Sequence, residues 1–182
     1  MNRIYLVLLL SLLLASRFSV AQESVSQPAT KLDKFTSKSG VIIKFEDYNL
    51  TGLAQQFGAS AETKIRKVHS GDDVKLFYLI SNKTEYGLKV AAIASEDFTE
   101  LSKALGTLQG QLVIDLQSKA DYLENKYVTE DGFHLGYLIQ KGKPTWYMRL
   151  EKYGSGGSIF LNQLTVIEDS FKLASTKLNE LK

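Results

Sequence analysis

Cysteine is absent from this 182-residue chain, and proline and histidine occur only twice each. Without cysteine there are no disulfides, no thiol nucleophile, no thiolate-bound metal and no lipid-modified cysteine. The nucleophile elbow of serine hydrolases, the zinc-binding helix of metalloproteases and the phosphate-binding loop are also missing from the sequence. We therefore name no catalytic residue, no metal and no cofactor, and we favour a binding protein over an enzyme.

The first 21 residues have the pattern of a secretory signal peptide. Arg3 precedes an almost wholly apolar run from Ile4 to Ala15, and the small residues Ser19 and Ala21 fit a cleavage site. The apolar run is shorter than the about 20 residues that a membrane-spanning helix needs. We expect cleavage after Ala21 and an exported protein, periplasmic or extracellular, that is soluble and does not span the membrane.

The charge balance gives no argument for a nucleic-acid partner. Lys and Arg together number 22, and Asp and Glu together number 20. Arg3 and Arg17 lie in the segment expected to be removed, so basic and acidic residues become equal in number. A formally neutral chain lacks the basic surface that attracts polyanions. We expect a protein, a peptide or an apolar small molecule as the partner.

We expect a single folded domain over residues 34–182, preceded by a flexible leader over residues 22–33. The leader is polar, contains Pro28 and lacks the periodicity of either a helix or a strand. A domain of this size can bury about 70% of its unfolded surface, which is enough for stability without disulfides.

Alternating apolar and polar segments, interrupted by two helical patterns, predict an α+β domain. They indicate an antiparallel sheet of about 7–9 strands with two long amphipathic helices. Leu101, Leu105 and Leu108 mark the first helix, and Ile167 and Phe171 mark the second, at spacings of three and four. In the second half we expect strands over residues 122–128, 133–140, 145–153 and 158–161.

Two strand-rich blocks, each ending in a helix, suggest two repeats. The segments Lys75 to Ile80 and His134 to Ile139 share four of six residues. An internal duplication would explain this match, and so would the small apolar alphabet of central strands. Both explanations stay open at this point.

The expected hairpin over residues 74–94 has two apolar faces. Tyr78 and Ile80 lie on one face, and Phe77 and Leu79 lie on the other. Monomeric proteins rarely leave such a face in water. The sheet must therefore curl on itself, receive the N-terminal strands, form a homodimer or enclose an apolar ligand.

A second hairpin, from Phe133 to Tyr153, has a self-consistent register. If residues 141–144 form a four-residue loop, Gln140 lies opposite Thr145. Trp146 then lies opposite Ile139, and the apolar residues of both strands share one face.

The opposite, outer face of this hairpin is the candidate ligand-binding surface. In this register it carries Tyr147, Arg149, Glu151 and Tyr153 in a line, with His134 opposite Glu151. Tyrosine and arginine dominate binding hot spots, because they combine a large contact area with directional donors. Gly136, opposite Arg149, is expected to leave open space beside the guanidinium. The alternative is a solvated sheet face without a role in binding.

We expect a non-enzymatic binding or interaction protein that uses this outer face for a protein or peptide. One alternative is a carrier for an apolar small molecule held between the sheet and the helices. A further alternative is an unusual hydrolase, in which His134 acts as general base, Glu151 orients it and Arg149 stabilises an anion.

Overall fold

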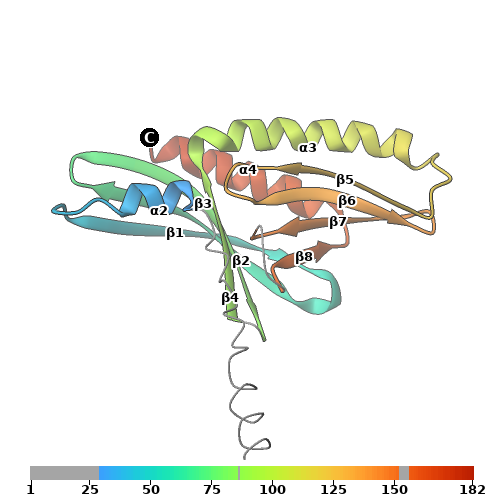
Figure 1. The fold of residues 1–182 in the computed structure, drawn as a ribbon, viewed down its shortest axis with the longest axis horizontal. Helices are drawn as coiled ribbons and strands as arrows, with labels where there is room; N and C mark the ends of the chain where they lie inside the picture. The colour runs from blue at the N-terminus through green and yellow to red at the C-terminus, as the bar shows by residue number, and fades with distance from the viewer. Residues whose placement is uncertain (1–28, 86, 152–155) are drawn as a thin grey trace, which may run out of the picture.

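The computed structural model of this chain describes residues 29–85, 87–151 and 156–182. The predicted signal peptide and its cleavage site lie outside these residues. The described residues contain eight strands in two four-stranded antiparallel sheets, together with three α-helices (Figure 1). The predicted antiparallel α+β class, its strand number and its two long helices are confirmed. No helix of the described part is long and apolar enough to cross a membrane.

Each sheet is a meander in which every strand pairs with the next along the chain. Sheet A consists of β1 (Ile43–Ala54), β2 (Ser60–Ser70), β3 (Asp73–Thr84) and β4 (Gly87–Ala94). Sheet B consists of β5 (Tyr122–Val128), β6 (His134–Gln140), β7 (Lys143–Arg149) and β8 (Ser158–Leu161). A short 3₁₀ helix, η2 (Gln56–Gly58), connects β1 to β2.

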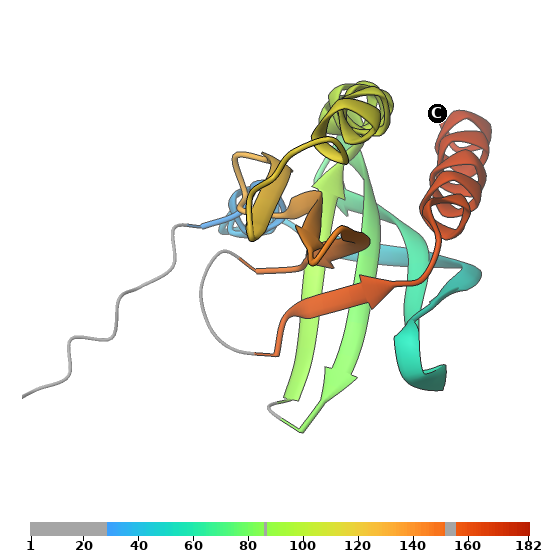
Figure 2. The same ribbon diagram turned by 90° about the vertical axis from the view of Figure 1, so that its right-hand side faces the viewer.

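A long helix follows each sheet, α3 (Ser95–Asp115) after β4 and α4 (Leu164–Glu180) after β8. Both helices lie on the same side of the molecule and run antiparallel to each other (Figures 1 and 2). Their apolar stripes, spaced at three and four residues, face one core shared by the inner faces of the two sheets. The two sheets and the two helices therefore form one folded unit.

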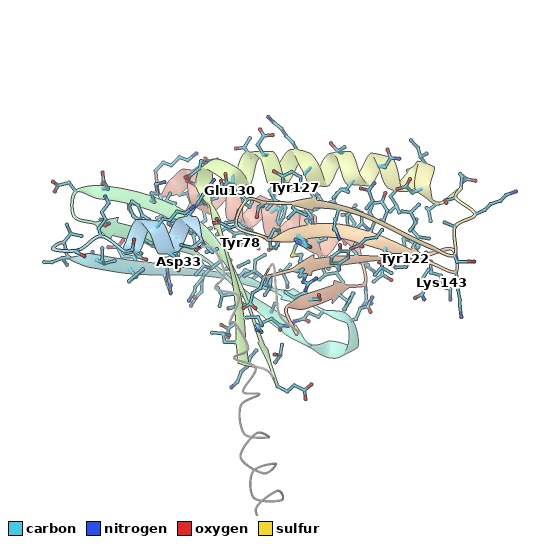
Figure 3. All side chains as sticks on the ribbon, in the orientation of Figure 1. Asp33, Tyr78, Tyr122, Tyr127, Glu130 and Lys143 are labelled. Atoms are coloured by element: carbon cyan, nitrogen blue, oxygen red, sulfur yellow. The ribbon has the colours of Figure 1, made fainter. Side chains whose placement is uncertain are left out.

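Two buried tyrosines attach the helices to the sheets through their hydroxyl groups. Tyr78 of β3 lies in the centre of the core (Figure 3), with its hydroxyl 2.6 Å from the Ser170 hydroxyl of α4. Burial raises the pKa of Tyr78 to about 12. Tyr137 of β6 donates to the carboxylate of Asp115 at the end of α3, at 2.5 Å. Buried polar groups of this kind are stable because they are hydrogen-bonded.

A third helix, α2 (Lys31–Thr36), covers part of the second apolar face of sheet A. Phe35 packs there in a small core with Phe77 and Leu79. The Thr30 side chain caps the helix in a capping box with Asp33. The helix thus begins inside the segment 22–33 that we expected to be a flexible leader. The N-terminal helix, which was not among the solutions that we had listed, covers this face only around Phe77 and Leu79, and Leu88 and Val90 of the same face remain 64% and 37% exposed.

The matching segments of the two halves occupy different positions in their sheets. Lys75 to Ile80 lies in β3, the third strand of sheet A, whereas His134 to Ile139 lies in β6, the second strand of sheet B. The match therefore does not align the two blocks as repeats. Three of the four shared residues are buried in the common core, Leu76, Tyr78 and Ile80 in β3 and Leu135, Tyr137 and Ile139 in β6. The small set of apolar residues used in central strands is therefore sufficient to explain the match.

Candidate functional site

The candidate site lies on the outer face of sheet B, around the β6–β7 hairpin. The hairpin turns through Lys141 and Gly142, both with positive φ (52° and 72°), as a two-residue loop with this left-handed geometry requires. Gln140 therefore pairs with Lys143. The predicted four-residue loop and the residue pairs derived from it are wrong by two positions.

Pro144 is the reason why we predicted a four-residue loop. Proline is typical of loops, but Pro144 lies within β7, opposite Ile139. In a hairpin with a two-residue loop, the pair next to the closing pair is not hydrogen-bonded, so β6 does not need the missing N–H. A shift of two residues leaves every side chain on its predicted face. Trp146 and Met148 accordingly face the core.

Tyr147 is on the outer face as predicted, but it is buried, with only 6% of its surface exposed. It pairs with Gly136 and lies beside Phe160 of β8, at 6.4 Å between ring centroids. Its hydroxyl donates to the carboxylate of Glu124 on β5. Burial and the Glu124 carboxylate raise the pKa of Tyr147, and the phenol in turn lowers the pKa of Glu124. Tyr147 therefore forms part of the floor of the site.

Gly136 does not leave the open space that we expected next to Arg149. A Cβ atom at this position would lie 2.7 Å from Cβ and 2.9 Å from Cα of Lys126. The neighbouring strand β5 fills the space, and glycine is what permits the two strands to approach so closely.

Besides Tyr147, sheet B brings two further predicted residues to this face, His134 and Arg149. They lie opposite each other on β6 and β7, and both are partly buried. Glu151, which we expected opposite His134, lies beyond the end of β7 and forms an ion pair with Lys89 of β4 at 2.9 Å. The predicted pairing of His134 with Glu151 is therefore wrong. Tyr153 lies outside the described residues.

The outer face contains a small hollow of about 150 Å³. Its lining comes from all four strands of sheet B: Glu124, Lys126, His134, Leu138, Tyr147, Arg149, Ser158 and Phe160. The residues from β5 and β8 were not among the predicted site residues, because the sequence pattern of one hairpin does not specify which strands flank it. The sequence shows alternating apolar and polar residues along β5 and β8, but it does not show the order of the strands in the sheet.

Three features of this face bear on what it can do. Phe160 is 41% exposed, so the face is open to solvent at the β8 side. Basic side chains outnumber acidic ones in the lining, and the one acidic group, Glu124, already accepts hydrogen bonds from Tyr147 and Lys126. In the described part of the chain, no group of three or more metal-ligating side chains occurs. The arrangement is suited to recognition of a small anionic or polar group beside an apolar surface.

Comparison of the chain with protein-family models, with curated proteins and with solved structures finds no match.

Proposed function

We propose that this chain is an exported, non-enzymatic binding protein that docks a protein or peptide partner on the outer face of sheet B. The hollow on that face is the observation that carries the proposal. Export is supported by the basic start, apolar run and small residues of the N-terminal segment.

The size of the hollow favours a side chain over a small-molecule ligand. Pockets for small molecules usually enclose about 300–1,000 Å³, whereas this hollow holds about 150 Å³. That volume suits one inserted side chain, with the surrounding strands as a contact surface. Anchoring of a partner through a single pocketed side chain is a common feature of protein interfaces.

The charges of the lining favour an acidic anchor. Arg149 and Lys126 are cationic, and His134 adds positive charge when protonated. Glu124 stays ionised and pairs with Lys126, so these two charges largely offset each other, and Arg149 gives the lining its net positive charge. Phe160 supplies exposed apolar surface at the rim. We infer a partner segment with an aspartate or glutamate side chain next to an apolar residue.

Two alternatives have less support. The carrier alternative places its ligand between the sheets and the helices, where the main core fills the interior and the groove of about 360 Å³ between α3 and β5 is open to solvent and does not enclose a ligand. The hydrolase alternative needs Glu151 to orient His134, and Glu151 is paired with Lys89.

Selection from a random peptide library against the purified full chain tests the proposal. We expect selected peptides to contain an acidic residue beside an apolar one, and to bind the double variant Phe160→Ala/Arg149→Ala about tenfold or more weakly than the wild type. The matched control is Leu173→Ala/Lys172→Ala on α4, because Leu173 is 43% exposed, close to the 41% of Phe160.

The control variant should bind these peptides like the wild type, and circular dichroism should show that both variants are folded. The proposal fails if no peptide is selected, or if the selected peptides bind the outer-face variant as tightly as the wild type.

A further inference from the structure

Strand β5 has a free edge. It forms one end of sheet B, and no strand in the described residues pairs with its outer side. Next to the strand, Thr129 N–H donates to the Phe133 carbonyl at 2.9 Å, which identifies a hydrogen-bonded pair in the register of β5 and β6. Hydrogen-bonded and non-hydrogen-bonded pairs alternate along an antiparallel ladder. The backbone N–H and C=O groups directed to the free edge therefore belong to Tyr122, Glu124, Lys126 and Val128.

The sequence of β5 is complementary to itself when it is read antiparallel. If a second copy of β5 pairs with the first around a two-fold axis at Asn125, Glu124 of each copy lies opposite Lys126 of the other. Tyr122 likewise lies opposite Val128 twice, and both residues are exposed, at 55% and 43%. Opposite charges and apolar pairs in facing positions stabilise strand pairing. In this pairing the N–H and C=O groups at the free edge of one copy lie opposite those of the other copy, as hydrogen bonding between the copies requires.

The charges on β5 favour this register over the two registers that are shifted by two residues. Only shifts by two residues keep the edge-directed groups in contact. A shift in one direction places Glu124 opposite Glu124 of the second copy, and a shift in the other direction places Lys126 opposite Lys126. Like charges in directly facing positions are destabilising. Charged side chains on an edge strand commonly prevent indiscriminate pairing, and here they leave one register open.

The space between β5 and helix α3 is partly open to solvent. Helix α3 runs along β5 (Figure 1), and Tyr122 and Tyr127 mark the two ends of the strand in Figure 3. A groove of about 360 Å³ lies between the helix and the strand. Its lining combines small and charged side chains of α3 with residues of β5: Glu100, Lys103, Ala104, Thr107, Leu108, Asn125, Lys126 and Tyr127.

We propose that the free edge of β5 is the interface of a homodimer, in which the two copies of sheet B join into one continuous eight-stranded sheet. A closed two-fold arrangement uses the same surface on both copies and caps an edge that would otherwise remain open. The outer face of sheet B stays accessible in this arrangement, but Glu124 and Lys126 belong both to the interface and to the lining of the hollow, whereas Val128 belongs to the interface alone.

Charge exchange on β5 tests this interface with internal controls. In Lys126→Glu the facing pairs become acidic with acidic, and in Glu124→Lys they become basic with basic. Sedimentation velocity of the full chain over a range of concentrations measures the dissociation constant of the dimer. We expect a concentration-dependent dimer for the wild type, and a dissociation constant raised about tenfold or more in each variant alone.

An equimolar mixture of the two variants restores both opposite-charge pairs, so it should recover dimers close to the wild-type affinity. Because Glu124 also accepts from Tyr147, Val128→Asp provides a second disruption that leaves this hydrogen bond in place. The inference is overturned if the wild type sediments as a monomer throughout, if single variants dimerise like the wild type, or if the mixture fails to recover dimers.

Discussion

Replacing Gly136 by alanine tests how closely β5 and β6 approach. The added methyl group would lie 2.7 Å from Cβ and 2.9 Å from Cα of Lys126, and closer still to the backbone carbonyl oxygen of Asn125. These atoms belong to the β5 backbone or are bonded directly to it, so they cannot swing aside like the end of a long side chain. The strand itself must move, and β5 carries both the rim of the hollow and the free edge. We expect Gly136→Ala to lower the free energy of unfolding by about 1–3 kcal/mol, the usual cost of overpacking.

Gly110 in α3 provides the matched control, because the same substitution there should have the opposite sign. No heavy atom lies within 4 Å of a Cβ built at Gly110, and the residue is exposed inside a helix. Alanine is favoured over glycine at such positions by about 0.5–1 kcal/mol. Gly110→Ala should therefore stabilise the protein.

Urea unfolding measures both changes in one assay. The single tryptophan, Trp146, is buried next to Tyr137 in the core and should report unfolding by fluorescence. With a urea dependence of about 2 kcal/mol per molar, Gly136→Ala should lower the midpoint by about 0.5–1.5 M, and Gly110→Ala should raise it. Equal midpoints for Gly136→Ala and the wild type would refute the close approach of the two strands.

Three further substitutions test separate parts of the structure. The hydrogen bonds and charge of Arg66 help to hold the pKa of Asp47 at about 2, below its ordinary 3.8. This lowered pKa stabilises the fold above pH 3.8, so Asp47→Asn should cost less than about 1 kcal/mol at neutral pH, and the difference from wild type should shrink as the pH falls towards 2. Tyr147→Phe should cost about 1–2 kcal/mol and raise the pKa of Glu124, which NMR titration measures; an unchanged pKa would contradict the hydrogen bond. Phe35→Ala should cost about 3 kcal/mol and speed hydrogen exchange in α2, and an unchanged exchange rate would argue against docking of that helix.

Hydrophobic periodicity was sufficient to predict most elements of this fold. The strands expected over residues 122–128 and 158–161 have these bounds in the structure. Helix α2 was missed because its six residues are too few for a periodic pattern to appear, although Thr30 and Asp33 stand at the spacing of a capping box. The order of the strands in each sheet could not be predicted from the hydrophobic pattern, because alternation in one strand specifies its buried face and not the strands beside it.

The error in the register of the β6–β7 hairpin affected the predicted facing pairs but not the predicted face of each side chain. Side chains alternate with a period of two, so an error of two residues changes every facing pair and no face. The outer position of Tyr147 and Arg149 depends only on the face, and it is present in the structure. The hydrolase alternative depended on one facing pair, His134 with Glu151, and that pair does not form because Arg149 takes the position opposite His134.

The free edge of β5 shows the same dependence on strand order. Glu124 and Lys126 alternate with Leu123, Asn125 and Tyr127 in the sequence, and by itself that pattern is typical of any half-buried strand. Its complementarity under a two-fold rotation acquires meaning only because β5 ends the sheet. Had β5 lain between two other strands, the same residues would face those strands and could not meet a second copy. The proposed interface therefore rests on charge pattern and strand order together, and the charge-exchange variants change the charge pattern while the strand order stays fixed.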